Sequence, residues 1–449
     1  MSGAQLLSGW GRTAPTRADV VRPDSSAGVV GALGQERHAI ARGLGRAYGD
    51  AAQNAGAAVL DMTGMRRVLA LDLERGVVTA EAGLDLDALI ALVLPHGWFV
   101  PVTPGTRHVT LGGALACDVH GKNHHVEGAF SRHVESFELV TPDGRVRDVR
   151  PGDAEHLFEA TAGGMGLTGV ITRVRLRLIA VSSAFVRVTT RRVPNLDELM
   201  ASMRRRDEDF RYSVAWIDCL RRGASLGRGI VLWGDHAEAG ELPAKLGRSP
   251  LDYANAVRLG VPDVVPSGLL NPLTAKAFTA VWYARAPARE RVSHEGIAAY
   301  FHPLDAVGGW NRLYGRRGFV QYQAVVPDAA EDAVRALLER VSRAGTSSFL
   351  AVLKRFGAGS GMLSFPMAGW TLALDIPAGA RDLAAVLDEL DELVVAAGGR
   401  VYLAKDARVR PDRLEAMYLD LPRWREVQRS IDPEAVMRSD LAVRLGLTA

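Results

Sequence analysis

The chain has 449 residues, of which 48% are hydrophobic and 23% charged, and this length allows the core of two or three domains. The net charge of +3, from 54 basic and 51 acidic residues, is too weak to indicate a nucleic-acid-binding protein. Two cysteines exclude a disulfide framework, and neither a run of 18 apolar residues nor a signal peptide is found, so we expect a folded protein that is cytoplasmic or peripheral at the membrane or cell envelope.

The first 180 residues are predicted to alternate short strands with glycine-rich turns. Residues 56–62 and 75–83 are typical of strands, and 84–97 of a helix that Asp85 caps and Gly97 ends. Residues 137–149 predict two strands joined by a turn. A helix, a glycine-rich loop and a long strand are then expected in 153–179.

The sequence pattern changes near residues 183 and 400, with fewer glycine clusters between them, which predicts two domains. Residues 184–399 alternate strands and helices and end in an amphipathic helix at 381–399. Residues 221–275 show weak periodicity and predict a long irregular region, such as a lid. We expect residues 1–183 and 400–449 to form one discontinuous domain and 184–399 the other. The apolar start of 401–409, "VYL", predicts a buried strand.

Three glycine-rich loops stand out, at 41–50 ("ARGLGRAYGD"), 104–121 and 163–171. Glycine lets backbone N–H groups converge on an anion, and three such loops suit an extended ligand the size of a dinucleotide. The spacing matches neither the Rossmann fingerprint nor a Walker A loop. Tight loop packing around a twisted sheet is the alternative explanation.

A polar cluster, "ACDVHGKNHH", occupies residues 116–125. Cys117, Asp118, His120, His124 and His125 are metal-ligand types. Structural zinc sites usually draw a second pair of ligands from another element, and no such pair recurs downstream. The sequence therefore does not favour a metal site here.

The segments "RGLGRAYGD", "PGTRHVTLGGALACDVHGKNHH" and "GGMGLTGVI" together resemble the FAD-binding domain of the p-cresol-methylhydroxylase and vanillyl-alcohol-oxidase superfamily. Within it, the chain is similar to the oxidase subunits of decaprenylphosphoryl-β-D-ribose 2'-epimerases, which serve actinobacterial arabinan synthesis. "GWGRTAP", "FHPLD", "GFVQYQ", "LSFP" and "AKDAR" extend this likeness along nearly the whole chain. It implies an α+β fold with an FAD domain and a substrate domain that holds an antiparallel sheet with flanking helices.

The resemblance also implies which residues meet FAD. Many superfamily members attach FAD through a histidine in the first glycine loop, where this chain has Arg46, so we expect non-covalent FAD. The cofactor-binding residues implied are Ala41, Arg42, Gly43, Leu44, Gly45, Arg46, Ala47, Tyr48, Gly49, Asp50, Gly105, Thr106, Thr110, Leu111, Gly112, Gly113, Cys117, Asp118, Val119, His120, Ile171 and Tyr402.

The implied reaction is oxidation of the 2'-hydroxyl of a polyprenyl-phosphate-linked ribose, which a separate NAD(P)H-dependent short-chain reductase completes to an epimerisation. Lys405 is the expected base or proton relay, because a buried lysine can lose its proton near neutral pH. Lys122 and His120 are also expected to be catalytic. The implied substrate contacts are Tyr48, Lys122, Trp216, Gln321, Gln323, Lys354 and Lys405. A lipid substrate requires an apolar groove, which 221–275 could supply or use for peripheral membrane contact.

Three positions depart from the family pattern. Thr371 and Ala373 stand where an asparagine and a cysteine are expected, and Phe301 where tyrosine is common. Hydride transfer requires no thiol, so these changes alter the expected pocket shape only. Two other functions stay open: an FAD-dependent oxidase of a soluble alditol, sugar or natural-product sugar, and a flavin-binding protein without catalysis.

Overall fold

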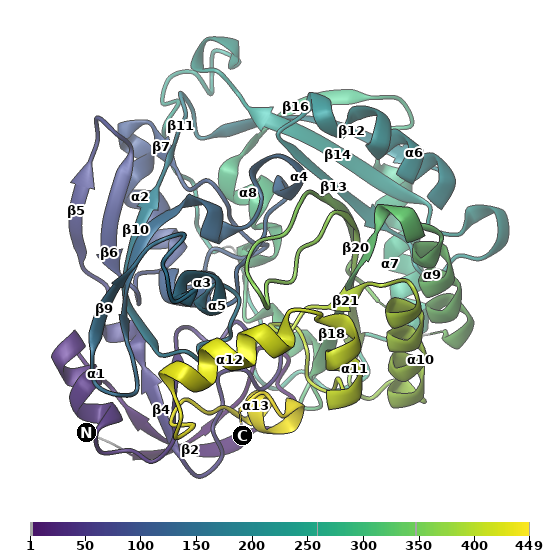
Figure 1. Cartoon of the computed structure of the whole chain (residues 1–449). Helices are drawn as coiled ribbons and strands as arrows, with labels where there is room; N and C mark the ends of the chain where they lie inside the picture. Colours follow the sequence, from purple (N-terminus) through teal and green to yellow (C-terminus); the bar gives the residue numbers. More distant parts are fainter. Residues whose placement is uncertain (1–2, 258, 346–347, 449) are drawn as a thin grey trace.

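The computed structural model describes residues 3–257, 259–345 and 348–448 and confirms an α+β fold (Figure 1). Two sheets come from the first 180 residues, where short strands alternate with turns. One has the order β1 (Gly3–Leu7), β2 (Thr16–Val21), β4 (Ala58–Asp61), β3 (Ala39–Arg42). The other has the order β5 (Val68–Asp72), β6 (Val77–Glu81), β10 (Val170–Arg177), β8 (Val134–Val140), β9 (Val146–Val149).

The helices among these strands are short, and most begin at a polar cap. Asp85 caps α2 by accepting the Ala88 N–H at 2.9 Å, and Gly97 follows the next 3-10 turn with φ of +78°, as the sequence predicts. The helix expected within 153–179 is limited to five residues. The bounds are α1 (Ser26–Leu33), α2 (Leu86–Val93), α3 (Leu111–Ala116), α4 (His124–Glu127) and α5 (Leu157–Thr161).

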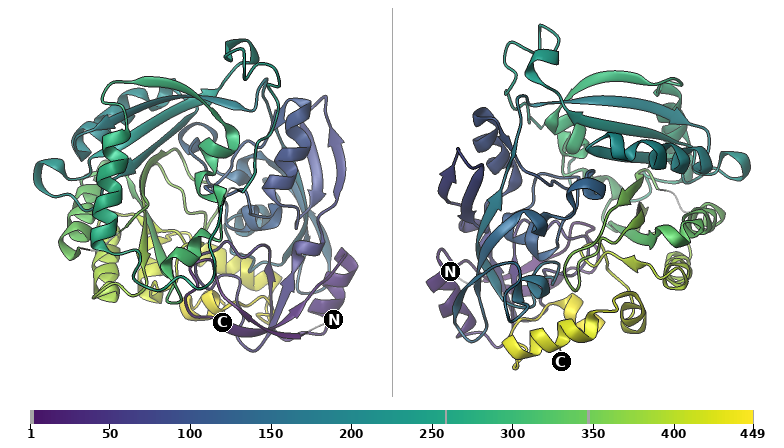
Figure 2. Two further views of the ribbon diagram at one scale, coloured as in Figure 1. Left: turned by 180° about the vertical axis from the view of Figure 1, so that it is seen from behind. Right: turned by 45° about the horizontal axis from the view of Figure 1, so that its top comes forward.

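An eight-stranded sheet, which we call the large sheet, forms the second part of the molecule (Figures 1 and 2). All of its pairings are antiparallel. Its order is β16 (Arg291–Gly296), β12 (Phe185–Val193), β14 (Gly229–His236), β13 (Tyr212–Ile217), β19 (Ala351–Phe356), β20 (Gly369–Pro377), β18 (Phe319–Pro327), β21 (Arg400–Val401). Two-stranded pairings join β7 (Trp98–Phe99) to β11 (Ile179–Ala180) and β15 (Leu259–Gly260) to β17 (Val307–Gly308).

Helices cover one face of the large sheet and leave the other face toward the N-terminal sheets (Figures 1 and 2). α9 repeats apolar residues at helical spacing (Val334, Leu337, Leu338, Val341), and all four are buried in the core cluster that holds Leu353 of the sheet. α6 and α10 add to the same cluster. The remaining bounds are α6 (Leu196–Arg206), α7 (Pro272–Arg285), α8 (Ile297–Phe301), α9 (Asp332–Ala344) and α10 (Leu383–Ala396).

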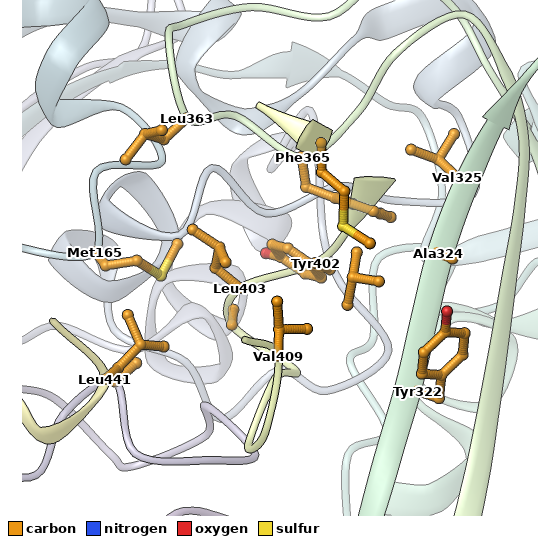
Figure 3. Packing of buried hydrophobic residues seen from close by; sticks show 14 of the residues in the cluster. Met165, Tyr322, Ala324, Val325, Leu363, Phe365, Tyr402, Leu403, Val409 and Leu441 are labelled. Atoms are coloured by element: carbon orange, nitrogen blue, oxygen red, sulfur yellow. The ribbon is translucent and has the colours of Figure 1, made fainter. Parts of the chain in front are cut away.

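The C-terminal segment returns to the N-terminal sheets. Trp424 donates its indole N–H to the Ala160 carbonyl at 2.9 Å, and Met437 forms a parallel bridge with Ala39. Buried residues of this segment, such as Leu403, Val409 and Leu441, pack together with Met165 and Tyr322 (Figure 3). The helices are α11 (Pro411–Met417), α12 (Leu421–Ile431) and α13 (Asp440–Leu445). β21 belongs to the large sheet, and the exact domain limits stay a prediction.

Two expectations about secondary structure are wrong. The region 221–275 is not irregular throughout, because β14 lies inside it and pairs with β12 and β13 on its two sides. The apolar run "GIVLW" is short and preceded by glycines, which makes its strand pattern weak in the sequence. Of residues 401–409 only Val401, the last residue of β21, is strand, and a turn carries Lys405. No helix formed by the described residues has both the length and the apolar composition needed to cross a bilayer.

Candidate active site

The loop that follows β3 has the backbone of an anion-binding nest. β3 ends at Arg42, and Gly45 has φ of +63°. Within the described residues, no backbone carbonyl accepts a hydrogen bond from the N–H groups of 44–47. A Cβ on Gly43 would lie 2.2 Å from Thr110 Oγ1, and one on Gly49 would lie 1.9 Å from the Asp406 carbonyl oxygen. Close packing therefore requires glycine at both positions. The N–H groups of 44–47, which lie between these glycines in the chain, are available to a ligand.

Side chains of this loop bind other protein groups. The Arg42 guanidinium donates to the carbonyls of Ala52 and Ser8 at 2.9 and 2.8 Å, and Asp50 accepts from Arg444. Arg46 lies 4.2 Å from the centroid of the Trp10 ring. Arg42 and Asp50 thus fix the loop, and any contact that they make to a cofactor would come from the backbone.

The second glycine loop, 104–121, packs against the first. Thr110 caps α3, and Thr106 Oγ1 donates to Asp305 at 2.9 Å. A Cβ on Gly112 would approach the Ala82 Cβ to 2.9 Å and the Ile171 Cβ to 3.7 Å. Asp118 accepts from Ser364 Oγ and the Ser131 N–H. The side chains of Thr106, Thr110 and Asp118 therefore stabilise the loop, whereas its backbone and Gly105 stay available.

The place where this loop meets the large sheet is lined by Cys117, His120 and Tyr402. Tyr402 donates its hydroxyl to the Cys117 carbonyl at 2.8 Å, and the His120 ring lies 5.2 Å from the Tyr402 ring. Burial lowers the pKa of His120 and raises that of the Cys117 thiol to about 12. At neutral pH the imidazole and the thiol are therefore both uncharged.

The open face of the large sheet presents a set of polar side chains. Gln323 pairs with Ala373, Ala373 with Val352, and Val352 with Trp216. This register and the alternation of strand residues place Trp216, Gln321, Gln323, Lys354, Thr371 and Asp375 on one face. A Gln323 Nε2 to His120 Nε2 distance of 3.0 Å joins this face to the second glycine loop.

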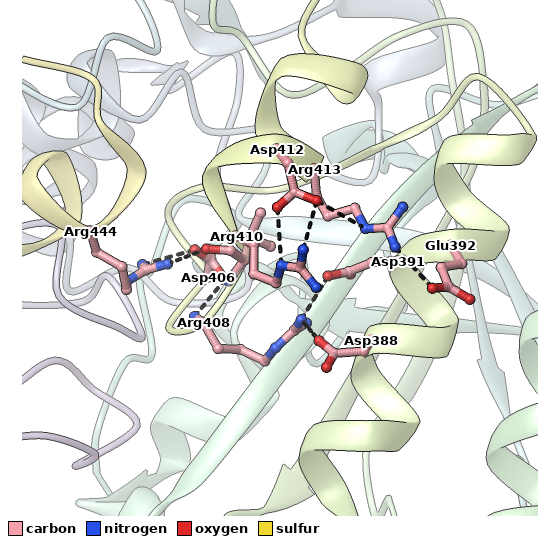
Figure 4. Close-up of polar contacts among 10 residues, drawn as sticks. Asp388, Asp391, Glu392, Asp406, Arg408, Arg410, Asp412, Arg413 and Arg444 are labelled. Carbon is pink, nitrogen blue, oxygen red and sulfur yellow. Dashed lines mark hydrogen bonds and ion pairs between the residues drawn. The ribbon is translucent and has the colours of Figure 1, made fainter.

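Lys405 meets the first glycine loop at this junction. Its Nζ atom lies 3.7 Å from the centroid of the Tyr48 ring, and burial lowers its pKa to about 8 although Asp375 opposes the change. Lys405 is not paired with Asp406. The Asp406 carboxylate contacts Arg444 at 2.9 Å and accepts the Val409 N–H, which anchors the turn that carries Lys405 (Figure 4).

Two more half-buried lysines belong to the same region. Burial and, to a smaller extent, the charges of Lys405 and Lys122 lower the pKa of Lys354 to about 7. Lys122 donates to the Tyr300 carbonyl, its Nζ atom lies 3.9 Å from the centroid of the Tyr300 ring, and burial lowers its pKa to about 8. The charges of Lys405 and Lys122 lower the pKa of Lys354, and those of Lys354 and Lys405 lower the pKa of His120, so the three lysines lie near enough to interact and would together attract an anion.

Asp375 is the residue of this site that the sequence did not reveal. It is buried on β20, accepts from the Gln321 amide, and burial raises its pKa to about 7. Its only sequence signal is its position two residues after Ala373, hence on the same face of a strand.

The three histidines of "HGKNHH" contact different parts of the protein. His124 accepts the Gly357 N–H at 3.2 Å, and His125 Nε2 lies 2.9 Å from the Asp207 carbonyl. These two rings hold α4 against the second part of the chain, whereas His120 lies at the candidate site.

Comparisons with known proteins agree with this geometry. Residues 19–150 match the FAD binding domain family. The chain is 42% identical to the decaprenylphosphoryl-beta-D-ribose oxidase of Mycolicibacterium smegmatis over 98% of this chain and 97% of that protein. It is 46% identical to an uncharacterized protein in the mprA 5' region of Streptomyces coelicolor, over 81% of this chain and all of that protein. The L-gulono-1,4-lactone dehydrogenase of Mycobacterium tuberculosis is 30% identical over 39% of this chain and 41% of its own length.

Proposed function

This chain belongs to the decaprenylphosphoryl-β-D-ribose oxidase family of FAD-binding proteins, and we propose that it oxidises the 2'-hydroxyl of decaprenylphosphoryl-β-D-ribose to the 2'-keto sugar. The observation that carries this proposal is a set of three half-buried lysines: Lys122 after the second glycine loop, Lys354 on the open face of the large sheet, and Lys405 against Tyr48 of the first loop. An oxidase of a phosphate-linked sugar needs both a base and an anion site, and this arrangement offers both.

FAD would be held by the backbone N–H groups of 44–47 and by the glycines of the second loop. The close approaches at Gly43 and Gly112 fit such a cradle, because any side chain there would displace the loops. The range 41–50 has no histidine and Arg46 lies against Trp10, which supports non-covalent attachment. When bound, FAD supplies the two-electron acceptor for a hydride.

Lys405 would take the proton of the 2'-hydroxyl. An ordinary lysine is protonated at neutral pH, but the lowered pKa of Lys405 leaves a useful fraction of neutral amine near pH 8. Asp375 would stabilise the ammonium form that results. Tyr48 contributes a ring face that holds Nζ in place, and neutral His120 with Gln323 would position the sugar.

Lys354 and Lys122 would bind the phosphate that joins the sugar to its lipid. At neutral pH Lys122 is mostly protonated and Lys354 partly so, and a bound phosphate would favour the ammonium form of both, because charges attract more strongly in an apolar surrounding than in water. Gln321 and Trp216 complete the side of the pocket made by the large sheet. Ala373 replaces the expected cysteine on this face, so the site has no thiol at that position.

The keto product would be consumed by a separate NAD(P)H-dependent short-chain reductase that returns a hydride to the other face of C2', which inverts that centre. The substrate is a membrane lipid, so we also propose that the protein contacts the membrane surface peripherally.

The test is product analysis. The purified holoprotein is incubated with a farnesyl-phosphoryl-β-D-ribose and an artificial electron acceptor, and the mixture is treated with borodeuteride. Deuterium at C2' of the recovered pentose is the expected result. Deuterium elsewhere, or turnover only with free alditols or lactones, would contradict the proposal and favour a soluble-sugar oxidase.

A further inference from the structure

Helix α7 has its large apolar side chains on the outside. It buries only Ala275 and Thr279, whereas Leu273, Phe278, Val281 and Trp282 are 78%, 44%, 52% and 48% exposed. A surface helix of a globular protein normally shows the opposite arrangement, with large apolar residues inside and polar residues outside. The inverted pattern therefore indicates that a ligand or partner covers the exposed apolar side chains.

The exposed apolar residues spread over about half of the helix circumference, because Leu273 and Trp282 lie about two and a half turns apart. Leu273, Ala277, Val281 and Arg285 follow one another at intervals of four residues, and Phe278 stacks on Trp282 with ring centroids 6.0 Å apart. We call this surface the α7 outer face. Val264 and Leu259, which precede the helix, are 84% and 69% exposed and add apolar surface to the same segment.

The charge around the α7 outer face is positive. Lys276, Arg285, Arg289 and Arg291 are exposed. The two acidic residues of 259–292 are engaged with cations outside it, since Asp263 pairs with Arg12 at 2.8 Å and Glu290 pairs with Arg206. Four basic side chains beside a row of large apolar ones are the pattern of a helix that lies in the interface of an anionic bilayer.

The position of α7 suits a lipid substrate. In the left view of Figure 2, α7 is the upright green helix at the outer edge of the large sheet. Phe278 lies 5.9 Å from Phe349, whose carbonyl accepts a hydrogen bond from the Trp216 indole N–H. One layer of side chains thus separates the α7 outer face from the sheet face where the sugar is proposed to bind.

We propose that α7 is a membrane-docking helix that inserts Leu273, Val281 and Trp282 into the interface of an anionic lipid bilayer, with Lys276, Arg285, Arg289 and Arg291 against the headgroups. This inference rests on the proposed function for its biological meaning, because docking there would place the pocket beside the membrane that holds the substrate. The chemistry of the surface favours a bilayer over a protein because large exposed apolar side chains and an excess of positive charge occur together.

The test is flotation of FAD-loaded protein with vesicles of phosphatidylglycerol and phosphatidylcholine. The parent should float with vesicles rich in phosphatidylglycerol and less with pure phosphatidylcholine, and high salt should weaken binding. The triple variant Leu273→Gln, Val281→Gln, Trp282→Gln should lose at least about tenfold in vesicle affinity, since three apolar side chains would no longer insert into the bilayer. The control triple variant Leu6→Gln, Leu419→Gln, Val443→Gln changes apolar residues that are exposed elsewhere and should float like the parent.

Flavin reduction by a short-chain, water-soluble lipid-linked ribose separates the two proposals. The α7 variant should bleach like the parent, which also shows that it is folded. A parent that floats but does not bleach would leave docking intact and contradict the proposed function. A parent that does not float, an α7 variant that floats normally, or a parent dimer that the α7 variant converts to a monomer would each overturn the docking helix, the last by assigning the face to a second copy.

Discussion

The Nζ atom of Lys405 lies 3.7 Å from the centroid of the Tyr48 ring, and the Tyr48 N–H donates to the carbonyl of Ala404 at 2.9 Å. The first glycine loop and the C-terminal turn are therefore held together by a side-chain and a backbone contact that Tyr48 makes to the adjacent residues Lys405 and Ala404. An ammonium over a ring face is favoured by the negative charge of that face. This contact would hold Lys405 in place for the proton transfer that we propose for it.

Replacing Lys405 with alanine should leave FAD bound and slow flavin reduction by the lipid-linked ribose about 10²- to 10⁴-fold, the usual contribution of a general base. Stopped-flow absorbance under anaerobic conditions measures this rate. Lys245→Ala, at an exposed position, is the matched control and should reduce like the parent. A normal rate in Lys405→Ala would remove Lys405 from the role of base.

The pH dependence of flavin reduction should depend on Asp375. Only neutral Lys405 can accept a proton, so the rate in the parent should rise with pH through about 8. The Asp375 carboxylate stabilises the Lys405 ammonium and raises its pKa, so Asp375→Asn should move the rising limb to lower pH. An unchanged profile in Asp375→Asn would show that the two groups do not interact.

Lys354→Met should stabilise the protein while weakening substrate binding. Burial and the neighbouring cations lower the pKa of Lys354 from its ordinary value of 10.5 to about 7, so the unfolded chain binds the extra proton between these pH values. Stability of the parent therefore rises with pH across this window. The variant, which carries no such group, should be more stable by about 1–4 kcal/mol at pH 7, with a gain that shrinks toward pH 10.

Thermal unfolding of holoprotein with excess FAD, at several pH values, measures this gain. A variant that is less stable than the parent at pH 7 would show that the Lys354 ammonium is well compensated in the fold. The Michaelis constant for the lipid-linked ribose should rise at the same time, because the phosphate loses a cation.

Gly43→Ala should lower the FAD content of purified protein. The new Cβ would lie 2.2 Å from Thr110 Oγ1, so the two glycine loops must move apart and the N–H groups of 44–47 lose their alignment. Gly240→Ala places its Cβ in open space at a backbone conformation that alanine accepts, and it should keep the FAD content of the parent. Equal FAD content in the two variants would place the cradle elsewhere.

The glycine loops could be predicted because their residue type is dictated by contact. Gly43 and Gly49 face atoms that leave no room for a Cβ, so the sequence shows the constraint directly. The amphipathic α9 and α10 and the cap at Asp85 follow local rules in the same way. Such features depend on neighbours in the chain or on short-range sterics, and sequence patterns record both.

Asp375 and the turn at Lys405 could not be predicted, because their environment comes from distant segments. Asp375 is surrounded by Gln321 from β18, Tyr48 from the first loop and Lys405 from the C-terminal turn, and no local pattern brings these together. The strand expected at 401–409 ends early because Asp406 turns inward to Arg444, an interaction that "VYL" does not indicate.

One measurement tests the central claim most directly: anaerobic flavin reduction by farnesyl-phosphoryl-β-D-ribose that carries deuterium at C2', compared with the unlabelled compound. The account predicts that both compounds bleach the flavin band and that the labelled one does so several-fold more slowly, because the C2'–H bond breaks in that step. Bleaching at equal rates by the two compounds, or an oxidised flavin that only alditols reduce, would contradict it.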